Sequence, residues 1–227
     1  MEKRSTEIEI LGISKDGKWK KIDELVHEEE IIVKLNGEIH KFYCILVDLE
    51  EMIVGNLKSK GLDPSSSRIK KLSSSEFEVN VSEELVKIPQ KCDSKKKLTK
   101  KEVFGSVETL NENSFLYRKT GCTHVIGICV DKGIFIEDIS RHCAIDKAIG
   151  LAIRDRINLA DSCWVSSCRQ TASTIRKAIF CQIPIVISIA APTDLAIEEA
   201  NKYGITLIGF ASSEGFNIYS QDWRIEI

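Results

Sequence analysis

The sequence predicts an α/β protein whose larger C-terminal part follows a smaller α+β part. From residue 124 onward, short apolar runs alternate with helical segments, which is typical of a sheet covered by helices. Before residue 101, strand-like runs surround a single helix. The 227 residues, 43% of them hydrophobic and 29% charged, are enough for a sizeable core and exclude a disordered or fibrous chain.

Residues 1–101 are predicted to form the N-terminal α+β domain. Apolar and charged residues alternate over 7–13 as in a half-buried strand. Asn36-Gly37 tolerates positive φ and predicts a hairpin turn. Asp48 can cap a helix that runs to Lys60 and stops at Gly61. The predicted strands of this domain cover residues 7–13, 31–35, 39–46 and 75–81.

A lysine-rich segment, residues 87–101, closes this domain. Seven lysines and one acid, Asp93, stand among polar residues without helix or strand periodicity. The segment is therefore predicted to be an exposed loop or linker, with the domain boundary near Lys101.

Residues 102–227 are predicted to form the C-terminal α/β domain. Its strands are predicted at residues 124–130, 134–139, 163–167, 185–190, 205–210 and 216–219, and its helices at 140–159, 171–181 and 192–204. Asp131-Lys132-Gly133 predicts a tight hairpin between the first two strands. A hairpin followed by βα units implies a largely parallel sheet with helices on both faces.

The start of the first C-terminal helix is densely polar. The group comprises Glu137, Asp138, Arg141, His142, Asp146 and Lys147. His142 and Asp146 are four residues apart and share a helical face, close to Cys143. Arg and His at a helix N-terminus favour an anion, because the exposed N–H groups and the helix dipole add to their charge. The alternative is a solvated helix start with ordinary ion pairs.

Two further segments follow strands at the edge where α/β sheets bind ligands. Arg169 comes directly after Ser166-Ser167-Cys168, and the turn 212–215 follows the strand at 205–210. Either can contact a nucleotide, Arg169 through its charge and the turn through backbone groups. The alternatives are a surface arginine and an ordinary chain reversal.

The eight cysteines do not form a zinc motif, because the sequence has no C-x-x-C. A zinc deaminase also needs H-x-E and P-C-x-x-C, which are absent. Residues 1–17 have no apolar signal core, so the thiols are expected to be reduced and the protein cytoplasmic. Five cysteines in apolar surroundings are expected to be small core residues: Cys44, Cys129, Cys143, Cys163 and Cys181.

Charge and hydropathy exclude two kinds of partner. The net charge of −2 and the pI of about 6.2 give no basic field for nucleic acid. The longest apolar run, residues 183–191, is too short to cross a bilayer, so no membrane segment is predicted.

Cys92 differs from the other cysteines, because it lies in the lysine-rich segment. Clustered cations lower the pKa of a thiol and raise its thiolate fraction, as a sulfur-accepting nucleophile requires. We therefore expect Cys92 to be exposed and readily alkylated. The alternative is an incidental loop cysteine.

The most informative segment of the chain is residues 135–150, FIEDISRHCAIDKAIG. It is similar to the stretch E-D-V-G-R-H-N-A-x-D-K-x-x-G, and with several other motifs in order it resembles the formate dehydrogenase accessory sulfurtransferase family (FdhD type). The other similar segments are 120–124 (TGCTH, for T-G-G-x-H), 167–169 (SCR, for S-G-R), 190–196 (AAPTDLA, for S-A-P-T-S-L-A), 204–210 with 216–219, and, in the N-terminal part, 28–37 and the helix to 61.

The resemblance implies a sulfur carrier with a cytidine-deaminase-like three-layer C-terminal domain, usually a homodimer. Such proteins take persulfide sulfur from a cysteine desulfurase and pass it to the molybdenum or tungsten bis(molybdopterin guanine dinucleotide) cofactor for formate dehydrogenase. The implied catalytic residue is Cys92. The implied cofactor-binding residues are His124, Arg141, His142, Lys147, Arg169, Phe210, Ala211, Ser212, Ser213, Glu214 and Gly215.

Departures from the family pattern keep other functions open. Where the family has C-G-x-C-G, this chain reads Cys92-Asp93-Ser94-Lys95-Lys96, so Lys95 replaces the second thiol. The chain can therefore be a cofactor-binding chaperone without sulfur transfer, while a nucleotide enzyme on a deaminase-like fold is disfavoured by the missing zinc motifs. Three motif positions gain cysteines, which either relay sulfur or fill space: Cys122, Cys143 and Cys168.

Overall fold

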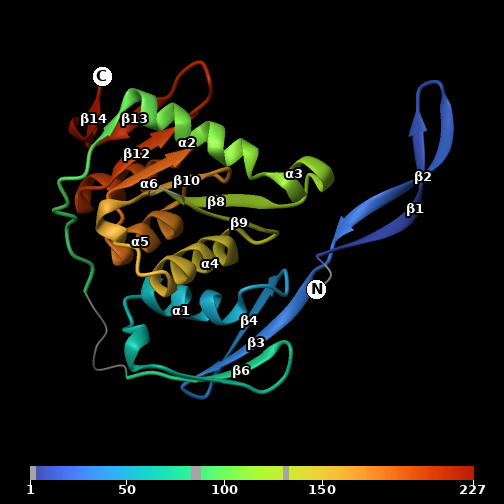
Figure 1. The fold of residues 1–227 in the computed structure, drawn as a ribbon, viewed down its shortest axis with the longest axis horizontal. Helices are drawn as coiled ribbons and strands as arrows, with labels where there is room; N and C mark the ends of the chain where they lie inside the picture. Colours follow the sequence, from blue (N-terminus) through green and yellow to red (C-terminus); the bar gives the residue numbers. More distant parts are fainter. Residues whose placement is uncertain (1–3, 83–87, 130–132) are drawn as a thin grey trace.

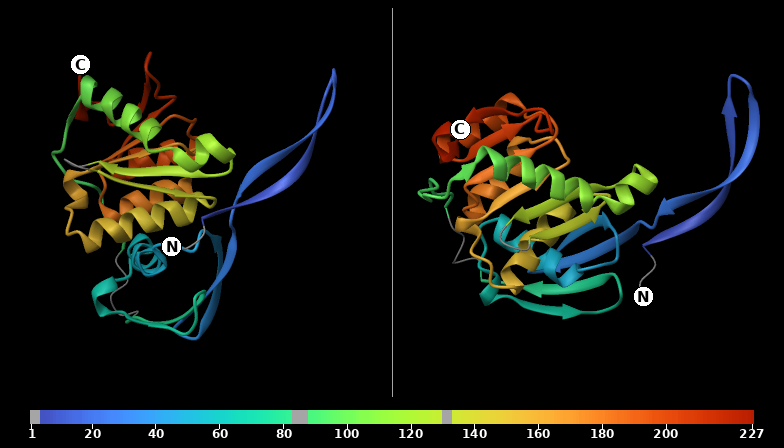
Figure 2. Two further views of the ribbon diagram at one scale, coloured as in Figure 1. Left: turned by 45° about the vertical axis from the view of Figure 1, so that its right-hand side comes forward. Right: turned by 45° about the horizontal axis from the view of Figure 1, so that its top comes forward.

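A long two-stranded arm precedes the body of the molecule. The computed structural model describes residues 4–82, 88–129 and 133–227. In it β1 (Ser5–Ser14) pairs with β2 (Gly17–Val26) over ten residues each, and the arm projects from the body in Figure 1 and in both views of Figure 2. An ion pair between Glu24 of the arm and Lys119 of the body joins the two. The half-buried strand predicted over 7–13 is a strand, but Ile13 is 76% exposed and Leu11 58%. The alternation of apolar and charged residues in this strand therefore does not correspond to a face buried in a hydrophobic core.

The rest of the N-terminal part is a four-stranded sheet covered by one helix. The strand order is β4-β3-β6-β5, with bounds β3 (Glu29–Leu35), β4 (Glu38–Cys44), β5 (Arg68–Lys71) and β6 (Glu76–Asn80). The predicted hairpin at Asn36-Gly37 is confirmed, with φ of 47° and 88°. Helix α1 (Leu49–Ser59) follows Asp48, whose side chain makes no capping hydrogen bond, and a short 3-10 turn (Pro64–Ser66) follows it.

The C-terminal part is built on a six-stranded mixed sheet of order β13-β12-β11-β10-β8-β9. The strands are β8 (His124–Cys129), β9 (Ile134–Asp138), β10 (Cys163–Ser166), β11 (Ile185–Ser188), β12 (Thr206–Gly209) and β13 (Asn217–Ser220). In this sheet only the pairings of β10 with β11 and of β11 with β12 are parallel. The prediction of a largely parallel sheet is wrong in this respect, because short reversals place β8, β9 and β13 antiparallel to their neighbours.

Helices cover both faces of this sheet, so the C-terminal part has three layers (Figure 1). One face packs against α4 (Arg141–Arg154), α5 (Ala172–Cys181) and α6 (Asp194–Tyr203). The other face packs against α2 (Lys100–Glu112), which leads into the short α3 (Phe115–Thr120). The α/β class is confirmed, whereas the finer cytidine-deaminase-like assignment stays a prediction.

Helix α4 begins where the sequence predicts, since the Ser140 hydroxyl accepts a hydrogen bond from the Cys143 N–H. It ends at Arg154 rather than near residue 159. Arg156 adopts a left-handed φ of 57°, and the next N–H, that of Ile157, donates to the Ala152 carbonyl. This bond closes the helix C-terminus and turns the chain away.

Two glycines hold the N-terminal and C-terminal parts together. A Cβ atom on Gly55 of α1 would lie 1.8 Å from the Asp146 carbonyl oxygen of α4. A Cβ on Gly150 of α4 would lie equally close to the Glu51 carbonyl oxygen of α1. The two helix backbones therefore touch, and no larger residue fits at either position without moving a helix.

The predicted domain division between residues 101 and 102 stays a prediction. Helix α2 already begins at Lys100, and the Thr99 and Glu102 side chains form a capping box around its start. Just before it, β7 (Leu98–Thr99) pairs with the C-terminal β14 (Ile225–Glu226), which follows the 3-10 turn Asp222–Arg224. The predicted turn residues 131 and 132 and the first lysine of the lysine-rich segment lie outside the described residues.

Within the part of the chain that the structure describes, no helix is long and apolar enough to cross a membrane.

Candidate functional site

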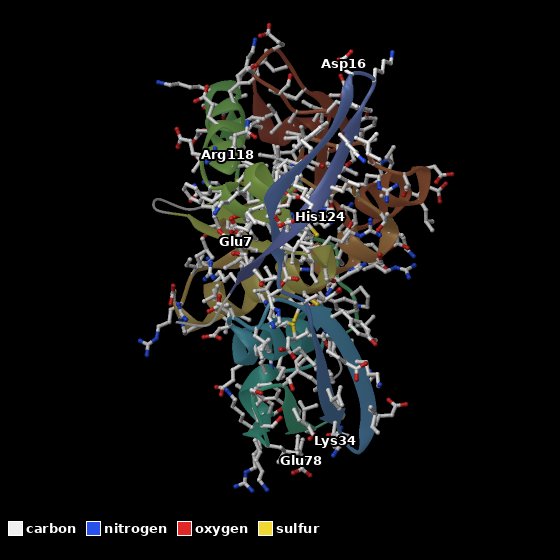
Figure 3. All side chains as sticks on the ribbon, turned by 90° about the vertical axis from the view of Figure 1, so that its right-hand side faces the viewer. Glu7, Asp16, Lys34, Glu78, Arg118 and His124 are labelled. Atoms are coloured by element: carbon white, nitrogen blue, oxygen red, sulfur yellow. The ribbon has the colours of Figure 1, made fainter. Side chains whose placement is uncertain are left out.

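Three of the predicted binding residues lie at the carboxyl edge of the parallel strands. His124 begins β8, which is antiparallel to β10 and therefore starts where β10 ends. His124 pairs across the sheet with Asp138, the last residue of β9, and Arg141 follows at the start of α4. Arg169 comes after the end of β10 and is exposed. Figure 3 shows His124 on the side of the body from which the arm projects.

Backbone hydrogen bonds tie the loops of this edge together. The Gln170 N–H donates to the Ala191 carbonyl over 3.2 Å, and the Phe210 N–H donates to the Ala190 carbonyl over 3.3 Å. The Ala211 N–H donates to the Ser188 carbonyl over 3.0 Å. The loops after β10, β11 and β12 therefore form one connected rim.

The electrostatics of this rim favour an anion. Burial lowers the pKa of His124, and the nearby Arg141 and Arg169 guanidinium groups lower it further. Burial also lowers the pKa of His142, with Lys177 and Arg141 as additional causes. The Asp138 carboxylate acts on His124 in the opposite direction, but its own oxygen is paired with Lys147. The Arg141 and Arg169 guanidinium groups beside His124 therefore make an environment that a phosphate group prefers.

The turn at 212–215 is closed by its own hydrogen bonds. The Ser212 hydroxyl accepts from the N–H groups of Glu214 (3.2 Å) and Gly215 (3.3 Å), and the Ser212 N–H donates to the Gly215 carbonyl. Ser213 and Glu214 are exposed. Phe210, just before the turn, is 53% exposed and has a left-handed φ of 52°. This exposed ring on an ordered turn is available for stacking on a base.

The placement of Lys147 contradicts its predicted role in cofactor binding. The side chain is 1% exposed, and its ammonium donates to an Asp138 carboxylate oxygen and to the Ile45 carbonyl, both over 2.6 Å. Burial raises the pKa of Asp138, while Lys147 acts to lower it. Lys147 therefore ties α4 to the N-terminal part and does not reach the rim.

Two other members of the polar group at the helix start are also structural. The Glu137 carboxylate accepts from the N–H groups of Leu116 and Tyr117 and so caps α3. Asp146 pairs with Lys177 over 2.5 Å. His142 lies apart from these pairs, on a pocket of about 340 Å³ between β4 and the start of α4.

Cys92 is not exposed, which makes the prediction of an accessible thiol wrong. The residue is 5% exposed, its N–H donates to the Tyr203 carbonyl over 2.8 Å, and its Sγ lies 3.9 Å from the Gln182 carbonyl oxygen. The neighbouring lysines project outward while the thiol packs with the core beneath α5 and α6. Cationic neighbours in sequence therefore did not imply exposure.

Cys92 and the rim lie at opposite edges of the central sheet. Tyr203 and Gln182 directly precede β12 and β11, so the segment around Cys92 crosses the amino edge of the parallel strands. In Figure 1 this segment follows the left side of the body, whereas β8 begins on the right, beside α3 and the arm. In this conformation the thiol cannot touch a ligand on the rim.

Arg224 is a candidate functional residue that the sequence did not reveal. It is 1% exposed, and its guanidinium donates to the carbonyls of Gly204 (2.8 Å) and Ser94 (3.1 Å) beside Cys92. Within the described chain its Nε has no hydrogen-bond partner. Burial lowers the pKa of Arg224, and the nearby Cys92 thiol acts in the opposite direction. The only available signal was an arginine among apolar C-terminal residues, which is too common to be informative.

The three gained cysteines have different surroundings. Cys122 is exposed. Cys143 is 2% exposed and hydrogen-bonds to Cys44. Cys168 is 2% exposed, with its Sγ 2.9 Å from the Ser166 hydroxyl. Cys143 and Cys168 thus make contacts typical of core thiols, while Cys122 is open to reagents.

Across residues 4–82, 88–129 and 133–227, no three His, Cys, Asp or Glu side chains group as metal ligands.

Comparison with known proteins matches most of the chain. A sequence profile described as the FdhD/NarQ family matches residues 75–226. Two relatives named "Sulfur carrier protein FdhD" come from Methanothermobacter thermautotrophicus (29% identical, covering 89% of this chain and 92% of the relative) and Bacillus pumilus (30%, covering 90% and 91%). A crystal structure of a formate dehydrogenase accessory protein from Desulfotalea psychrophila superposes with a TM-score of 0.85 at 24% identity, covering 98% of this chain and 100% of the other.

Proposed function

Because the chain belongs to the FdhD/NarQ family, we propose that it is a sulfur carrier for the maturation of formate dehydrogenase. The donor in this proposal is a cysteine desulfurase, and the acceptor is the molybdenum or tungsten bis(molybdopterin guanine dinucleotide) cofactor. The observation that carries it is Cys92, a thiol held beside a buried cation in a chain whose relatives are named sulfur carriers. We place the protein in the cytoplasm as a homodimer, as the family resemblance implies.

The proposed first step occurs at Cys92. Its thiolate attacks the outer sulfur of a desulfurase persulfide, R–S–SH. A new S–S bond forms on Cys92, the old S–S bond breaks, and the desulfurase leaves as the thiolate R–S⁻. The product, Cys92–S–SH, is more acidic than a thiol, and the Arg224 guanidinium supports its anion. The 5% exposure of Cys92 requires the segment to open before the donor can reach it.

The proposed acceptor binds on the rim at the carboxyl edge. Arg141 and Arg169 supply charge for its phosphate groups, and His124 supplies an imidazole for hydrogen bonds. His142 is not assigned to the rim, because it lines the separate pocket beside β4. The exposed Phe210 ring stacks on guanine, and the turn Ser212–Gly215 lies against the sugar. Ala211 is left out, contrary to its predicted role, because it is 3% exposed and packs in the core beneath α2. Lys147 is left out, because its ammonium is engaged with Asp138.

A second function is favoured by two observations at the same segment. Lys95 stands where the family has its second thiol, and Cys92 is buried. Both favour a chaperone that binds the cofactor and delivers it without transferring sulfur. In this alternative the rim still binds the cofactor, and Cys92 does not carry a persulfide.

Persulfide transfer distinguishes the two functions. The purified full chain is incubated with a cysteine desulfurase and cysteine, and its intact mass and peptides are measured. The sulfur-carrier function predicts gain of one sulfur atom on Cys92, loss of that adduct in Cys92→Ser, and retention in Cys181→Ser, a buried thiol of the same core cluster. Absence of an adduct on Cys92, with the rim still binding GDP, would leave only the chaperone.

A further inference from the structure

A second pair of thiols lies on the α2 face of the central sheet. Cys129 ends β8 and Cys163 begins β10, and the two residues are directly opposite each other in the antiparallel register. Directly opposed side chains in such a pair point to the same face of the sheet. Both thiols pack with the cluster beneath α2, close enough for each to act on the pKa of the other.

A pocket of about 330 Å³ opens over this pair. Both cysteines line the pocket, and Cys129 is only partly buried, whereas Cys163 is 2% exposed. A Cβ atom on Gly105 of α2 would meet no atom within 4 Å, so the missing side chain leaves the pocket open on that side. The other residues around the pocket are Lys96, Leu98, Glu102, Ser106, Thr109, Gly133 and Phe135.

The two thiols are chemically unequal. Cys129 is partly exposed, whereas Cys163 is 2% exposed. Burial raises the pKa of Cys163. Cys129 is therefore the thiol that an incoming disulfide meets first, and Cys163 is the thiol held behind it.

The backbone allows these sulfurs to bond. Opposed residues in antiparallel strands have Cα atoms about 4.5–5.5 Å apart. A disulfide needs a Cα separation of about 4.4–6.8 Å. The register of β8 and β10 thus meets this requirement without moving either strand.

We propose that Cys129 and Cys163 form a redox-active dithiol that reacts with small disulfides through this pocket. The Cys129 thiolate attacks one sulfur of R–S–S–R, which forms a mixed disulfide and expels R–S⁻. Cys163 then loses its proton and attacks the Cys129 sulfur, which forms the Cys129–Cys163 disulfide and expels the second R–S⁻. The dithiol loses two electrons, and the small disulfide gains them as two thiols. This site is independent of the proposed sulfur carrier function, because neither thiol is Cys92.

The test uses the reduced full chain and bis(2-hydroxyethyl) disulfide as the oxidant. Samples are quenched with N-ethylmaleimide and analysed by intact mass and peptide mapping. The expected product lacks two hydrogens and links Cys129 to Cys163. Cys44 and Cys143 are the matched internal control, because they also act on each other's pKa but are 0% and 2% exposed. They should stay reduced while the first pair closes.

Three variants make the result decisive. Cys163→Ser should stop at the mixed disulfide on Cys129, and Cys129→Ser should leave Cys163 unmodified. Gly105→Leu retains both thiols but fills the pocket, and it should slow closure roughly tenfold or more. Closure at an unchanged rate in Gly105→Leu would overturn access through the pocket. Oxidation of Cys44–Cys143 first, or a wild-type pair that stays reduced, would overturn the dithiol itself.

Discussion

The two edges of the central sheet differ in the solvent exposure of their functional groups. At the amino edge, Cys92 and Arg224 are 5% and 1% exposed and are held by hydrogen bonds to neighbouring loops. At the carboxyl edge, Arg169 is exposed, Phe210 is 53% exposed, and His124 is half-buried. One edge thus encloses a thiol and a cation, and the other presents cations and an aromatic ring to solvent.

This difference separates two chemical requirements. A persulfide is lost to water-borne thiols and oxidants, so enclosure preserves it. A large anionic nucleotide needs an open, positively charged surface. The proposed sulfur carrier therefore protects its cargo at one edge and binds its acceptor at the other. The following predictions compare the two edges, beginning with the largest effect.

The largest expected contrast is in the free energy of unfolding, which Arg224→Ala should lower much more than Arg169→Ala. Removing the Arg224 guanidinium leaves the Gly204 and Ser94 carbonyls without their donor inside the protein. We expect a loss of about 3 kcal/mol in the free energy of unfolding. Arg169 is exposed, so its replacement should change stability by less than about 0.5 kcal/mol. Urea unfolding followed by circular dichroism measures both, and similar losses in the two variants would contradict the contrast between the edges.

Alkylation rates should also separate the edges. Cys122, two residues before His124, is exposed and should react with iodoacetamide roughly 100-fold faster than Cys92, which reacts only after its segment opens. Peptide mapping under limiting reagent gives both rates in one sample. In about 6 M urea, which unfolds the protein, the alkylation rates of Cys122 and Cys92 should converge. Faster labelling of Cys92 in the native protein would show that the amino edge is open in solution.

Ligand binding should depend on the carboxyl edge alone. Arg169→Ala should weaken GDP binding by about 1 kcal/mol, which is at the low end for a charge-assisted contact because Arg169 is exposed. Isothermal titration calorimetry gives the affinity, with Cys92→Ser as the control from the opposite edge. Failure of the unchanged protein to bind GDP would refute the rim as the cofactor site.

The smallest effect is a pH dependence from His124. Its folded pKa is lowered by burial and by Arg141 and Arg169, so the unfolded chain binds a proton more readily than the folded one. The free energy of unfolding should therefore fall as the pH drops from about 7.5 through the unfolded histidine pKa of about 6.5. His124→Asn should flatten this fall when urea midpoints are compared across that range. An unchanged slope would mean that His124 is solvated in the folded protein.

The sequence was informative where local signals decide structure. Asn36-Gly37 predicted the hairpin, Ser140 the start of α4, and Gly204, with φ of 72°, the end of α6. No element was predicted for residues 102–123, so helix α2 was missed, although Val103, Val107 and Leu110 have helical spacing. The Thr99 and Glu102 capping box was the signal that could have revealed it.

The burial of Cys92 and Lys147 could not be predicted from neighbouring residues. Cys92 is covered by residues 182 and 203, some ninety or more positions away in the chain. Lys147 is neutralised by Asp138, but its second bond goes to the Ile45 carbonyl of the N-terminal part. Long-range packing decided both placements, whereas the cationic rim followed from strand ends and helix starts that the sequence marked.

The contact between Gly55 and Gly150 has a consequence for synthesis on the ribosome. The α1 surface around Gly55 finds its partner only when α4, nearly a hundred residues later, has been made. The ion pair of Lys147 with Asp138, which also binds the Ile45 carbonyl, forms no sooner. Domains generally fold as they emerge from the ribosome. In the nascent chain, part of the α1 surface therefore stays exposed to solvent until α4 has been synthesised. Chain elongation, rather than the N-terminal sequence alone, thus sets when this half becomes complete.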